Sequence, residues 1–503
     1  MKPVFVDGIG ITRFGKDPRP LPAIFCDAAR QALESGRCQD VDAIFIGVMA
    51  AEEFTGDGNI ASCIADALGL TGRPAVRIET ASSSGAAALY AGVQAIASGC
   101  HRRVLVVAGE KMTHFGTRAA TRVLAGVLDR EERQCGATMP ALAAMIAEKY
   151  RQHFRLSRSR MEAMLCAVAL KNHLNASHNP LAHFRNAVTR EMYLASDFVA
   201  TPLRRFDCAP ITDGAAALVL TAERTDVRLS GIGQGTGPVS MAERETFVSF
   251  PATRIAAARA YRMAETSPEG IDIAEVHDAF TPFEIISTED LGFFPPGKGG
   301  EAALAGKTAL DGPLPVNASG GLKARGHPVG ASGLAQVVEI AKALRGHGAG
   351  NREFMRGLAQ STGGLATNNF VTILERAGAR AVHSPGLPAA LEVPVDRPKK
   401  APRREPAGSE GEIETFTVLH VTPEGFSPPL ALALIRDHAR RLVIAQGKDS
   451  RQLKIGREVY LRRGDGFYVF KVKSRLEIAK EAVRKLLQRG LRWRRPRLGE
   501  LPT

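Results

Sequence analysis

Four short segments of the chain combine nucleophilic side chains, histidines and glycines in patterns that could serve nucleophilic or acid–base chemistry. In the first, IETASSSG at residues 78–85, an apolar run ends in three serines and a run of small residues follows. A nucleophile at such a strand-to-helix turn lies at a helix N-terminus, where the helix dipole and backbone N–H groups stabilise an oxyanion. Serine is also a common helix cap, so this segment alone indicates capping more often than catalysis.

Two further segments each centre on a histidine. The segment NASGGLKARGHPVGASG at 317–333 surrounds His327 with glycines and opens a predicted helix. Such a loop brings backbone close to a ligand and holds the ring rigidly, so it is the strongest local signal in the chain. The segment EVHDAF at 275–280 places His277 beside an acid after a short apolar run. By itself that pattern favours a histidine that simply ends a strand.

The fourth segment, QSTGG at 360–364, lies just before a run of β-branched residues. Its two glycines, Gly363 and Gly364, either lend backbone N–H donors to a ligand or form an ordinary turn. The segment gains meaning only in combination with the other three.

The elements that must position these segments alternate along residues 1–378. Short apolar runs rich in β-branched residues predict buried strands, and a small-residue run predicts a helix at 83–98. This alternation predicts an α/β fold with a mainly parallel sheet. Polar helices within 135–200 indicate an insertion over the core. The predicted strands are 41–49, 102–109, 215–223 and 368–376.

The remainder of the chain differs in character. Residues 379–411 are rich in Pro, Lys and Arg without apolar periodicity, which predicts an extended linker. Residues 412–473 hold five short strand-like runs separated by turn residues, which predicts a small antiparallel barrel. Residues 474–503 carry nine Lys and Arg against three Glu and predict a basic amphipathic helix and tail that dock back onto the protein. The apolar face of that helix comprises Leu476, Ala479, Val483, Leu486 and Leu487.

Composition narrows the class of protein. The net charge of +14 over 503 residues is compatible with scattered surface arginines or with attraction of a polyanion such as the phosphates of coenzyme A. Because no aromatic-rich binding motif accompanies the charge, we expect no nucleic-acid binding. The N-terminus shows no secretory signal and no apolar run reaches ~18 residues, so we expect a cytoplasmic protein without a membrane span. Seven scattered cysteines without a C-x2-C pair argue against a disulfide framework and a zinc site.

Together the four segments resemble thiolases of the sterol-carrier-protein-X type and their bacterial and archaeal relatives, over about residues 1–378. Further blocks that carry the resemblance are GEKMT (109–113), KNHLNASHNPLAHFR (171–185) and DCAPITDGAAALVL (207–220). The resemblance implies a five-layered α/β fold of two similar halves, 1–225 and 226–378, with a loop insertion at about 111–200. It also implies an acyl-CoA substrate, no cofactor beyond the coenzyme A of that substrate, no metal, and assembly as a dimer.

The resemblance also implies roles for individual residues. The residue at Ser82 is normally a cysteine that attacks the acyl-CoA and holds the acyl group as a thioester. The histidine matching His327 activates that nucleophile and helps line an oxyanion hole, and the histidine matching His277 supports the hole for the second acyl group. The remaining expected site residues lie in the glycine-rich loops: Gly363 and Gly364 as backbone donors to an oxyanion, and Ser319, Gly320 and Gly326 as substrate contacts.

The chain departs from this pattern at both cysteine positions. Ser82 stands where the nucleophilic thiol is expected, and Gln360 and Ser361 flank the place of the second cysteine, which acts as acid and base for the enolate carbon. A thiol with a pKa of about 8.5 is easily activated, whereas a hydroxyl needs a base in contact, and His327 is the candidate. The resulting oxygen ester is harder than a thioester to pass to a carbon acceptor, which argues against ordinary thiolase chemistry.

The segment 412–473 resembles the OB-fold part of acyl-CoA-associated accessory proteins that bind thiolase-like partners. A zinc ribbon with four cysteines usually precedes that barrel, but no cysteine follows Cys208, so the ribbon is absent here. The resemblance implies a barrel that packs on the thiolase unit and helps form the acyl-CoA channel. The alternation of Phe467, Tyr468 and Phe470 favours core packing over stacking on bases.

Three functions are compatible with these residues. The first is an acyltransferase that works on acyl-CoA thioesters through Ser82, His277 and His327. The second is a retro-aldol lyase acting on a β-hydroxyacyl-CoA, which the missing cysteines favour; such a lyase needs an acid, and Tyr261 is predicted to be a packing residue. The third is a non-catalytic scaffold that pairs with an active thiolase and delivers its barrel to it. Apart from the choice among these functions, the expected partner is a second copy of the chain or another thiolase-like subunit.

Overall fold

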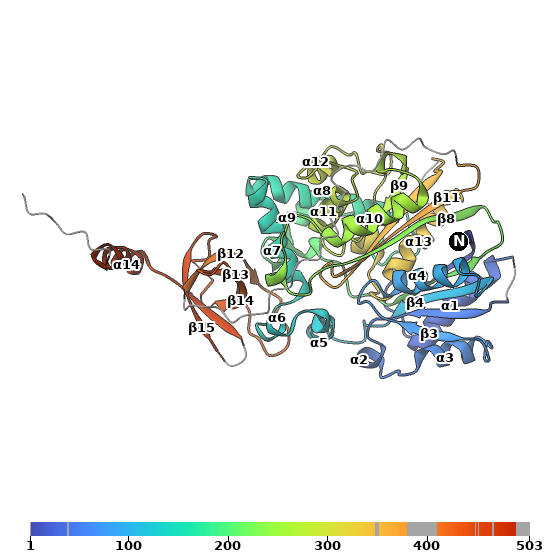
Figure 1. The fold of residues 1–503 in the computed structure, drawn as a ribbon, viewed down its shortest axis with the longest axis horizontal. Helices are drawn as coiled ribbons and strands as arrows, with labels where there is room; N and C mark the ends of the chain where they lie inside the picture. The colour runs from blue at the N-terminus through green and yellow to red at the C-terminus, as the bar shows by residue number, and fades with distance from the viewer. Residues whose placement is uncertain are drawn as a thin grey trace, which may run out of the picture.

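The chain folds into a large α/β unit and a small β-barrel that contacts it (Figure 1). The computed structural model describes residues 2–37, 40–347, 352–379, 410–447, 449–450, 452–464 and 467–488. The linker predicted at 379–411 lies almost wholly outside these residues. We call residues 2–379 the catalytic unit and the strands between residues 410 and 472 the barrel.

A nine-stranded sheet runs through the catalytic unit. Its order is β3 (Ala75–Ile78), β2 (Ala43–Gly47), β4 (Arg103–Glu110), β7 (Gly214–Thr221), β1 (Val4–Ile11), β8 (Val227–Thr236), β11 (Asn368–Arg376), β10 (Arg356–Gly363) and β9 (Ile273–Glu275). The N-terminal strands meet the C-terminal strands at the short β1–β8 ladder.

The strand directions correct one expectation. Only β3–β2, β2–β4 and β10–β9 pair in parallel, and the other five neighbours pair antiparallel, so the prediction of a mainly parallel sheet is wrong. An apolar run indicates that a strand is buried on both faces of the sheet, but it does not indicate in which direction the strand runs. The turn between β10 and β11 spans only residues 364–367, which is too short for the crossover that parallel strands need.

Helices and strands together form five layers. The outer face of the N-terminal strands is covered by α1 (Leu21–Ser35) and α3 (Ile60–Ala67). The middle layer, between the two sets of strands, consists of α4 (Ser84–Ala97) and α13 (Ser332–Leu344). The outer face of the C-terminal strands is covered by α10 (Pro251–Ala264), with α11 (Thr281–Asp290) beside it. The catalytic segments begin or end elements of the sheet and of this middle layer.

The insertion lies between β4 and β7 and faces the barrel. It contains α5 (Thr117–Leu124), α6 (Arg130–Gln134), α7 (Met139–His153), α8 (Arg158–Ser177), α9 (Arg190–Ala195) and the hairpin β5 (Phe198–Ala200) and β6 (Leu203–Arg204). Helix α7 contains both polar and apolar residues, yet it is buried from Ala141 to Glu148 and at Tyr150. The barrel covers one side of the helix and the catalytic unit covers the other. Met145, in the middle of α7, is a fully buried core residue.

Five strands close the barrel: β12 (Glu410–Leu419), β13 (Leu430–Asp437), β14 (Leu442–Gly447), β15 (Glu458–Arg463) and β16 (Tyr468–Val472). Around the barrel the order is β12, β13, β14, β16, β15 and back to β12, with only β14 and β16 parallel. Phe470 is buried in the barrel core. The catalytic unit extends the barrel sheet, since Ala200 of β5 pairs with Leu419 of β12. These two parts of the chain therefore share backbone pairing as well as side-chain contacts.

The C-terminal helix α14 (Arg475–Gln488) does not dock as expected. It projects away from the barrel (Figure 1), and Leu476 of the predicted apolar face is 64% exposed. The side chains of Val483, Leu486 and Leu487 lie outside the described residues. Its attachment is ionic: the ammonium of Lys473 lies 2.6 Å from Glu481 of α14.

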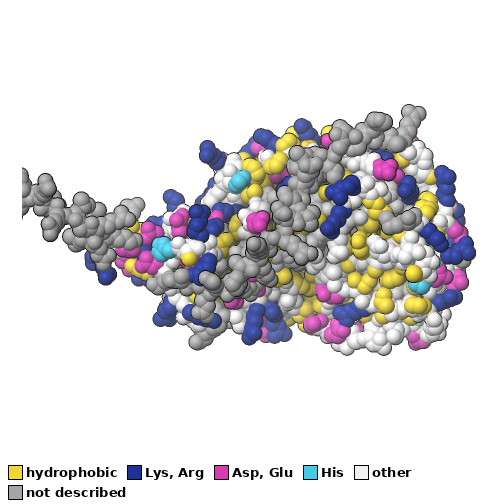
Figure 2. Space-filling model, in the orientation of Figure 1, with side chains coloured by type: hydrophobic (Ala, Val, Ile, Leu, Met, Phe, Trp, Pro, Cys, Tyr) yellow, Lys and Arg dark blue, Asp and Glu magenta, His cyan; other side chains and the backbone are white. Residues whose placement is uncertain are grey.

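Two expectations concern the surface of the protein, namely no membrane span and no nucleic-acid binding. Among the described residues no helix is long and apolar enough to cross a membrane. On the face drawn in Figure 2, Lys and Arg side chains are scattered among acidic and apolar ones and form no continuous stripe.

Candidate functional site

The three serines between β3 and α4 have different surroundings. Ser83 donates to the Thr80 carbonyl (2.7 Å) and Ser84 to the Ala81 carbonyl (2.6 Å), so both stabilise the turn. Ser82 is half-buried, and its hydroxyl makes no hydrogen bond to any residue that the structure describes. The preceding Ala81 has a φ of +57°, a strained conformation for alanine that such a turn imposes. The turn therefore leaves Ser82, just before the N-terminus of α4, free to react.

His327 is held as a base. Ser332 Oγ donates its single hydrogen to the Pro328 carbonyl (2.8 Å), so at 2.6 Å from His327 Nδ1 it can only accept. The neutral ring of His327 therefore carries its hydrogen on Nδ1 and a lone pair on Nε2. Burial, together with the charge of Arg325, lowers the pKa of His327 to about 3, which keeps Nε2 unprotonated at neutral pH.

His277 is held in the opposite tautomer. The Thr362 backbone N–H donates to His277 Nδ1 (3.2 Å), so the neutral ring carries its hydrogen on Nε2. Burial, and secondarily His327, holds its pKa well below the ordinary range. The two rings meet edge to face, with centroids 5.2 Å apart and planes at 88°. The two neighbouring rings therefore offer different groups: His327 Nε2 has a lone pair, and His277 Nε2 has an N–H donor.

The serine turn joins the same place through close backbone contacts. The Gly85 N–H donates to the Gly330 carbonyl (2.9 Å), which ties the start of α4 to the loop of His327. A Cβ on Gly363 would lie 2.1 Å from the Thr80 carbonyl oxygen, so only glycine lets β10 approach the turn this closely. The four predicted segments thus meet in one site, built from both halves of the catalytic unit.

The remaining predicted site residues stabilise the conformation of the loops around the site. Ser319 is buried, and both its backbone N–H (2.9 Å) and its hydroxyl (2.7 Å) donate to the buried carboxylate of Glu275. Gly320 and Gly326 have φ values of +102° and +117° and form the turns on either side of residues 321–325. Gly364, with a φ of +57°, follows the last residue of β10 and begins the turn to β11. Direct contacts of these residues with a substrate stay predictions.

One residue that the sequence analysis missed supports the histidine loop. Glu110, at the end of β4, is fully buried and accepts backbone N–H groups of Met49 (2.9 Å), Ala50 (3.2 Å) and Gly330 (3.1 Å). Burial raises its pKa to about 7. It connects the loop after β2 to the loop that carries His327. Its signal was present in the sequence as an acid directly after a buried apolar run, within the GEKMT block.

The place of the second cysteine contains no substitute acid. The side-chain amide oxygen Oε1 of Gln360 accepts the His277 backbone N–H (2.8 Å), so Gln360 positions that histidine. Ser361 points to the other face of β10, where its buried hydroxyl finds no partner in the described part of the chain. Cys208 pairs its backbone with Phe280, but burial raises the pKa of its thiol to about 12. Among the residues that the structure covers, no cluster of His, Cys, Asp or Glu could hold a metal ion.

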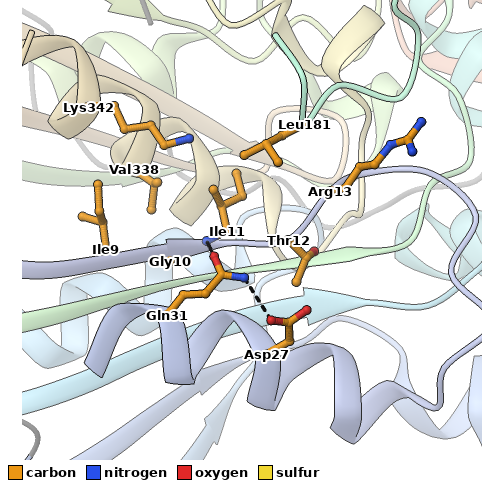
Figure 3. Close-up of a pocket in the computed structure, with 10 residues that line it drawn as sticks. All are labelled: Ile9, Gly10, Ile11, Thr12, Arg13, Asp27, Gln31, Leu181, Val338 and Lys342. Carbon is orange, nitrogen blue, oxygen red and sulfur yellow. Dashed lines mark hydrogen bonds between the residues drawn. The ribbon is translucent and has the colours of Figure 1, made fainter. Parts of the chain in front are cut away.

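A cavity of about 270 Å³ lies elsewhere, between β1, α1 and α13 (Figure 3). Its polar groups are engaged with one another: Gln31 accepts the Ile11 N–H (3.1 Å) and donates to Asp27 (2.9 Å). None of the predicted site residues lines it, so it is separate from the serine–histidine site.

Comparison with known proteins agrees with this architecture. Residues 25–224 match the family model of the thiolase N-terminal domain, and residues 233–376 match the model described as thiolase C-terminal domain-like. The chain is 40% identical over 390 residues to the acetyl-CoA acetyltransferase of Methanothermobacter thermautotrophicus, covering 75% of this chain and 100% of the relative. It is 30% identical to sterol carrier protein 2 of Oryctolagus cuniculus, covering 70% of this chain and 67% of the relative.

Solved structures show the same fold. A monomeric SCP2-thiolase like protein type 1 from Mycobacterium smegmatis matches 94% of this chain and 99% of its own, with a TM-score of 0.73 and 18% identity. The Ltp2-ChsH2(DUF35) aldolase matches 75% of this chain and 98% of its own, with a TM-score of 0.64 and 22% identity. The chain belongs to the thiolase family, and it is an enzyme of the acyltransferase class.

Proposed function

We propose that the chain transfers acyl groups from acyl-CoA thioesters through an acyl-enzyme on Ser82. The observation that carries this proposal is the pair of opposite histidine tautomers in loops that contact the turn of Ser82, whose hydroxyl has no partner among the described residues. Acyl transfer needs a nucleophile, a base and a donor to the developing oxyanion, and Ser82, His327 and His277 provide one of each. The similarity to acetyl-CoA acetyltransferases of 38–40% identity supports the same substrate class.

In the first half-reaction, Ser82 Oγ attacks the thioester carbonyl carbon while its proton passes to His327 Nε2. The carbonyl oxygen gains negative charge, which the His277 Nε2–H and the N-terminus of α4 stabilise. The C–S bond then breaks, and the proton on His327 passes to the sulfur, so that free coenzyme A leaves and an oxygen ester remains on Ser82. Because burial lowers the pKa of His327 to about 3, its Nε2 is unprotonated at neutral pH and can accept the proton of the attacking hydroxyl.

The second half-reaction passes the acyl group from Ser82 to an acceptor. An oxygen ester is less activated than a thioester, which favours a thiol, alcohol or water acceptor over a carbon acceptor. His327 Nε2, free again after coenzyme A leaves, takes the acceptor's proton as the acceptor attacks the ester carbon, and returns that proton to Ser82 Oγ as the ester C–O bond breaks. We infer that the protein is an acyltransferase or thioester hydrolase rather than a carbon–carbon condensing thiolase.

The retro-aldol alternative gains no support from the site. That reaction needs an acid beside the enolate carbon, and tyrosine was its candidate. Tyr261 is fully buried and donates to the Leu291 carbonyl (2.9 Å), and Tyr150 and Tyr193 donate to the buried carboxylates of Glu289 and Asp207. All six tyrosines of the chain are described, and none bonds to either site histidine.

The barrel belongs to the same proposal. Its five-stranded closed order, with only the third and fifth strands parallel, supports an OB-fold. Since it shares a core cluster with α7 and pairs with β5, we infer that it is a built-in accessory domain of the catalytic unit. No second chain is then needed to supply that domain.

Intact-protein mass spectrometry after incubation with acyl-CoAs from acetyl to decanoyl tests the proposal. We expect the wild-type protein to gain the mass of the acyl group with release of one equivalent of free coenzyme A. Ser82→Ala should abolish the adduct, and His327→Ala should slow it by about 10²–10⁴-fold, since it removes the general base.

Two results would contradict this mechanism. An adduct that persists in Ser82→Ala would place the acyl group elsewhere, and failure to release coenzyme A from any member of the series would rule out acyl transfer. Release of an aldehyde or ketone from a β-hydroxyacyl-CoA would support the lyase instead.

A further inference from the structure

Helix α5 lies beside the catalytic turn. Its inner residues Ala120, Val123 and Leu124 pack in an apolar cluster that also contains Ala81 and Val329. Ala81 directly precedes Ser82, and Val329 follows His327 by two positions. The inner face of α5 therefore rests against both segments that carry the proposed nucleophile and base.

The outer face of α5 is held by the barrel. Arg118 donates from Nε to the Thr422 carbonyl (3.3 Å), and from Nη2 to the Thr422 hydroxyl (3.2 Å) and the Phe426 carbonyl (2.8 Å). Thr422 is 2% exposed and belongs to the loop between β12 and β13. One guanidinium thus joins α5 to two points of the 420–429 loop.

An apolar contact runs parallel to this polar one. Val127, just after α5, packs both in the cluster around Ala81 and in the larger cluster that includes barrel residues. Phe426 of the loop and Leu430, the first residue of β13, pack in that larger cluster. The barrel loop is therefore in continuous contact with the surroundings of Ser82 through α5 and Val127.

Four apolar side chains of α5 and of the segments next to it are only half-buried. Phe115, Val123, Leu124 and Val127 each keep part of their surface accessible, although they adjoin the turn of Ser82. Half-covered apolar side chains beside a nucleophile provide the lining that an acyl chain needs, because such chains bind in concave apolar surroundings. A longer acyl chain on Ser82 has more apolar surface to bury against these side chains than an acetyl group has.

We propose that α5 is a wall of the acyl pocket, that it favours acyl chains longer than acetyl, and that the barrel fixes its position through Arg118. The proposal rests on acyl transfer at Ser82 as described above. It makes Arg118 a positioning residue that acts on chain-length preference without touching the substrate. The ligand class is an aliphatic acyl-CoA of medium chain length.

The test compares the affinities of two non-reactive thioether analogues, those of acetyl-CoA and octanoyl-CoA, by isothermal titration calorimetry on the full chain. In Arg118→Met we expect the ratio of the two dissociation constants to shift about three- to tenfold against octanoyl, as loss of hydrogen bonds of ordinary strength implies. Thr422→Val removes one of these three bonds and also the bond from the Thr422 hydroxyl to the Phe426 carbonyl (2.8 Å), so it should shift the ratio in the same direction. The melting temperature of each variant checks that folding is intact.

Lys149→Met is the matched control. Lys149, on α7, pairs with Glu414 of the barrel and has no contact with α5, and Glu414 keeps its second partner Arg436 at 2.9 Å. This variant removes a positive charge from the same interface, so its affinity ratio should stay within about twofold of the wild type.

The outcomes separate the two proposals. An unchanged ratio in Arg118→Met and Thr422→Val, or an equal shift in Lys149→Met, overturns the role of α5. A weaker but equal affinity for both analogues also overturns it, because it shows a general structural effect. If the ratio shifts while the wild-type protein forms no adduct on Ser82, the wall stands as a binding surface and the proposed acyl transfer fails.

Discussion

The catalytic site and the barrel interface both join distant parts of the chain, but with different kinds of contact. The site depends on backbone groups at van der Waals limits and on buried hydrogen bonds, as between Gly363 and Thr80 or Glu110 and Gly330. The interface combines a broad leucine-rich cluster with side-chain bonds that are partly open to solvent, such as those of Arg118. Changes in the site should therefore be nearly all-or-none, whereas changes at the interface should be graded.

The largest effect on this comparison should come from Gly363→Ala. The added Cβ would lie 2.1 Å from the Thr80 carbonyl oxygen and 2.4 Å from Ser83 Oγ, so β10 and the serine turn must separate. A displacement of about 1 Å of reacting groups costs on the order of 10²-fold in rate. We expect the rate of acyl-enzyme formation, followed by quenched-flow mass spectrometry, to fall by at least that factor.

Gly58→Ala is the control for this substitution. A Cβ at Gly58 meets no atom within 4 Å, and the residue lies outside the site, so its acylation rate should match that of the wild type. If Gly363→Ala acylates as fast as Gly58→Ala, the close approach of β10 does not set the position of Ser82.

An intermediate effect is expected for Glu110→Gln. The amide keeps one acceptor oxygen but turns its NH2 group toward a backbone N–H that Glu110 now satisfies, which leaves a buried donor unpaired. That costs about 1–3 kcal/mol and loosens the loop of His327, so we expect acylation to slow about tenfold. Urea unfolding and acylation kinetics measure the two consequences.

The pH dependence of stability gives this substitution a second readout. Burial raises the pKa of Glu110 from 4.5 to about 7, so between these values the folded protein holds a proton that the unfolded chain releases. The contribution of this group is therefore fully present below about pH 4.5 and is lost as the pH rises through 7. Glu110→Gln should lose this component, and an identical pH profile in both proteins would show that Glu110 does not titrate in this range.

The sequence predicted the elements better than their arrangement. Apolar runs and turn residues located the five barrel strands and four of the nine strands of the main sheet, namely β2, β4, β7 and β11, because burial and turn chemistry are local properties. Strand direction was not predictable, since an apolar run is the same in either direction. The prediction that α14 docks onto the protein through Leu476 was wrong, because an apolar helix face becomes buried only where a complementary surface lies within reach.

The site shows the same division. The family resemblance pointed to acyl transfer at Ser82 and His327. The fold adds the physical reason, because Ser83 and Ser84 hold the turn while the Ser82 hydroxyl is free. Glu110 was missed because an acid at a strand end usually faces solvent, and its burial depends on loops that are distant in the chain.

The smallest effect should come from Thr415→Val at the barrel interface. The Thr415 hydroxyl is buried and donates to the Met145 carbonyl of α7 (3.0 Å), while valine has nearly the same shape. Because a carbonyl within a helix keeps its helical partner, the loss amounts to one ordinary hydrogen bond, or about 0.5–1.5 kcal/mol in the free energy of unfolding. Urea unfolding of the full chain should show this decrease, and the exposed Thr71→Val should show none.

The acylation rate of Thr415→Val decides whether interface and site really differ. If the interface responds in graded fashion, a loss of this size at α7 leaves Ser82 and His327 in place, and the rate changes by less than about twofold. A decrease as large as that of Gly363→Ala would mean that β12 and α7 hold the catalytic geometry as strictly as β10 does. The barrel would then be part of the catalytic framework instead of a domain that adjusts one wall of the acyl pocket.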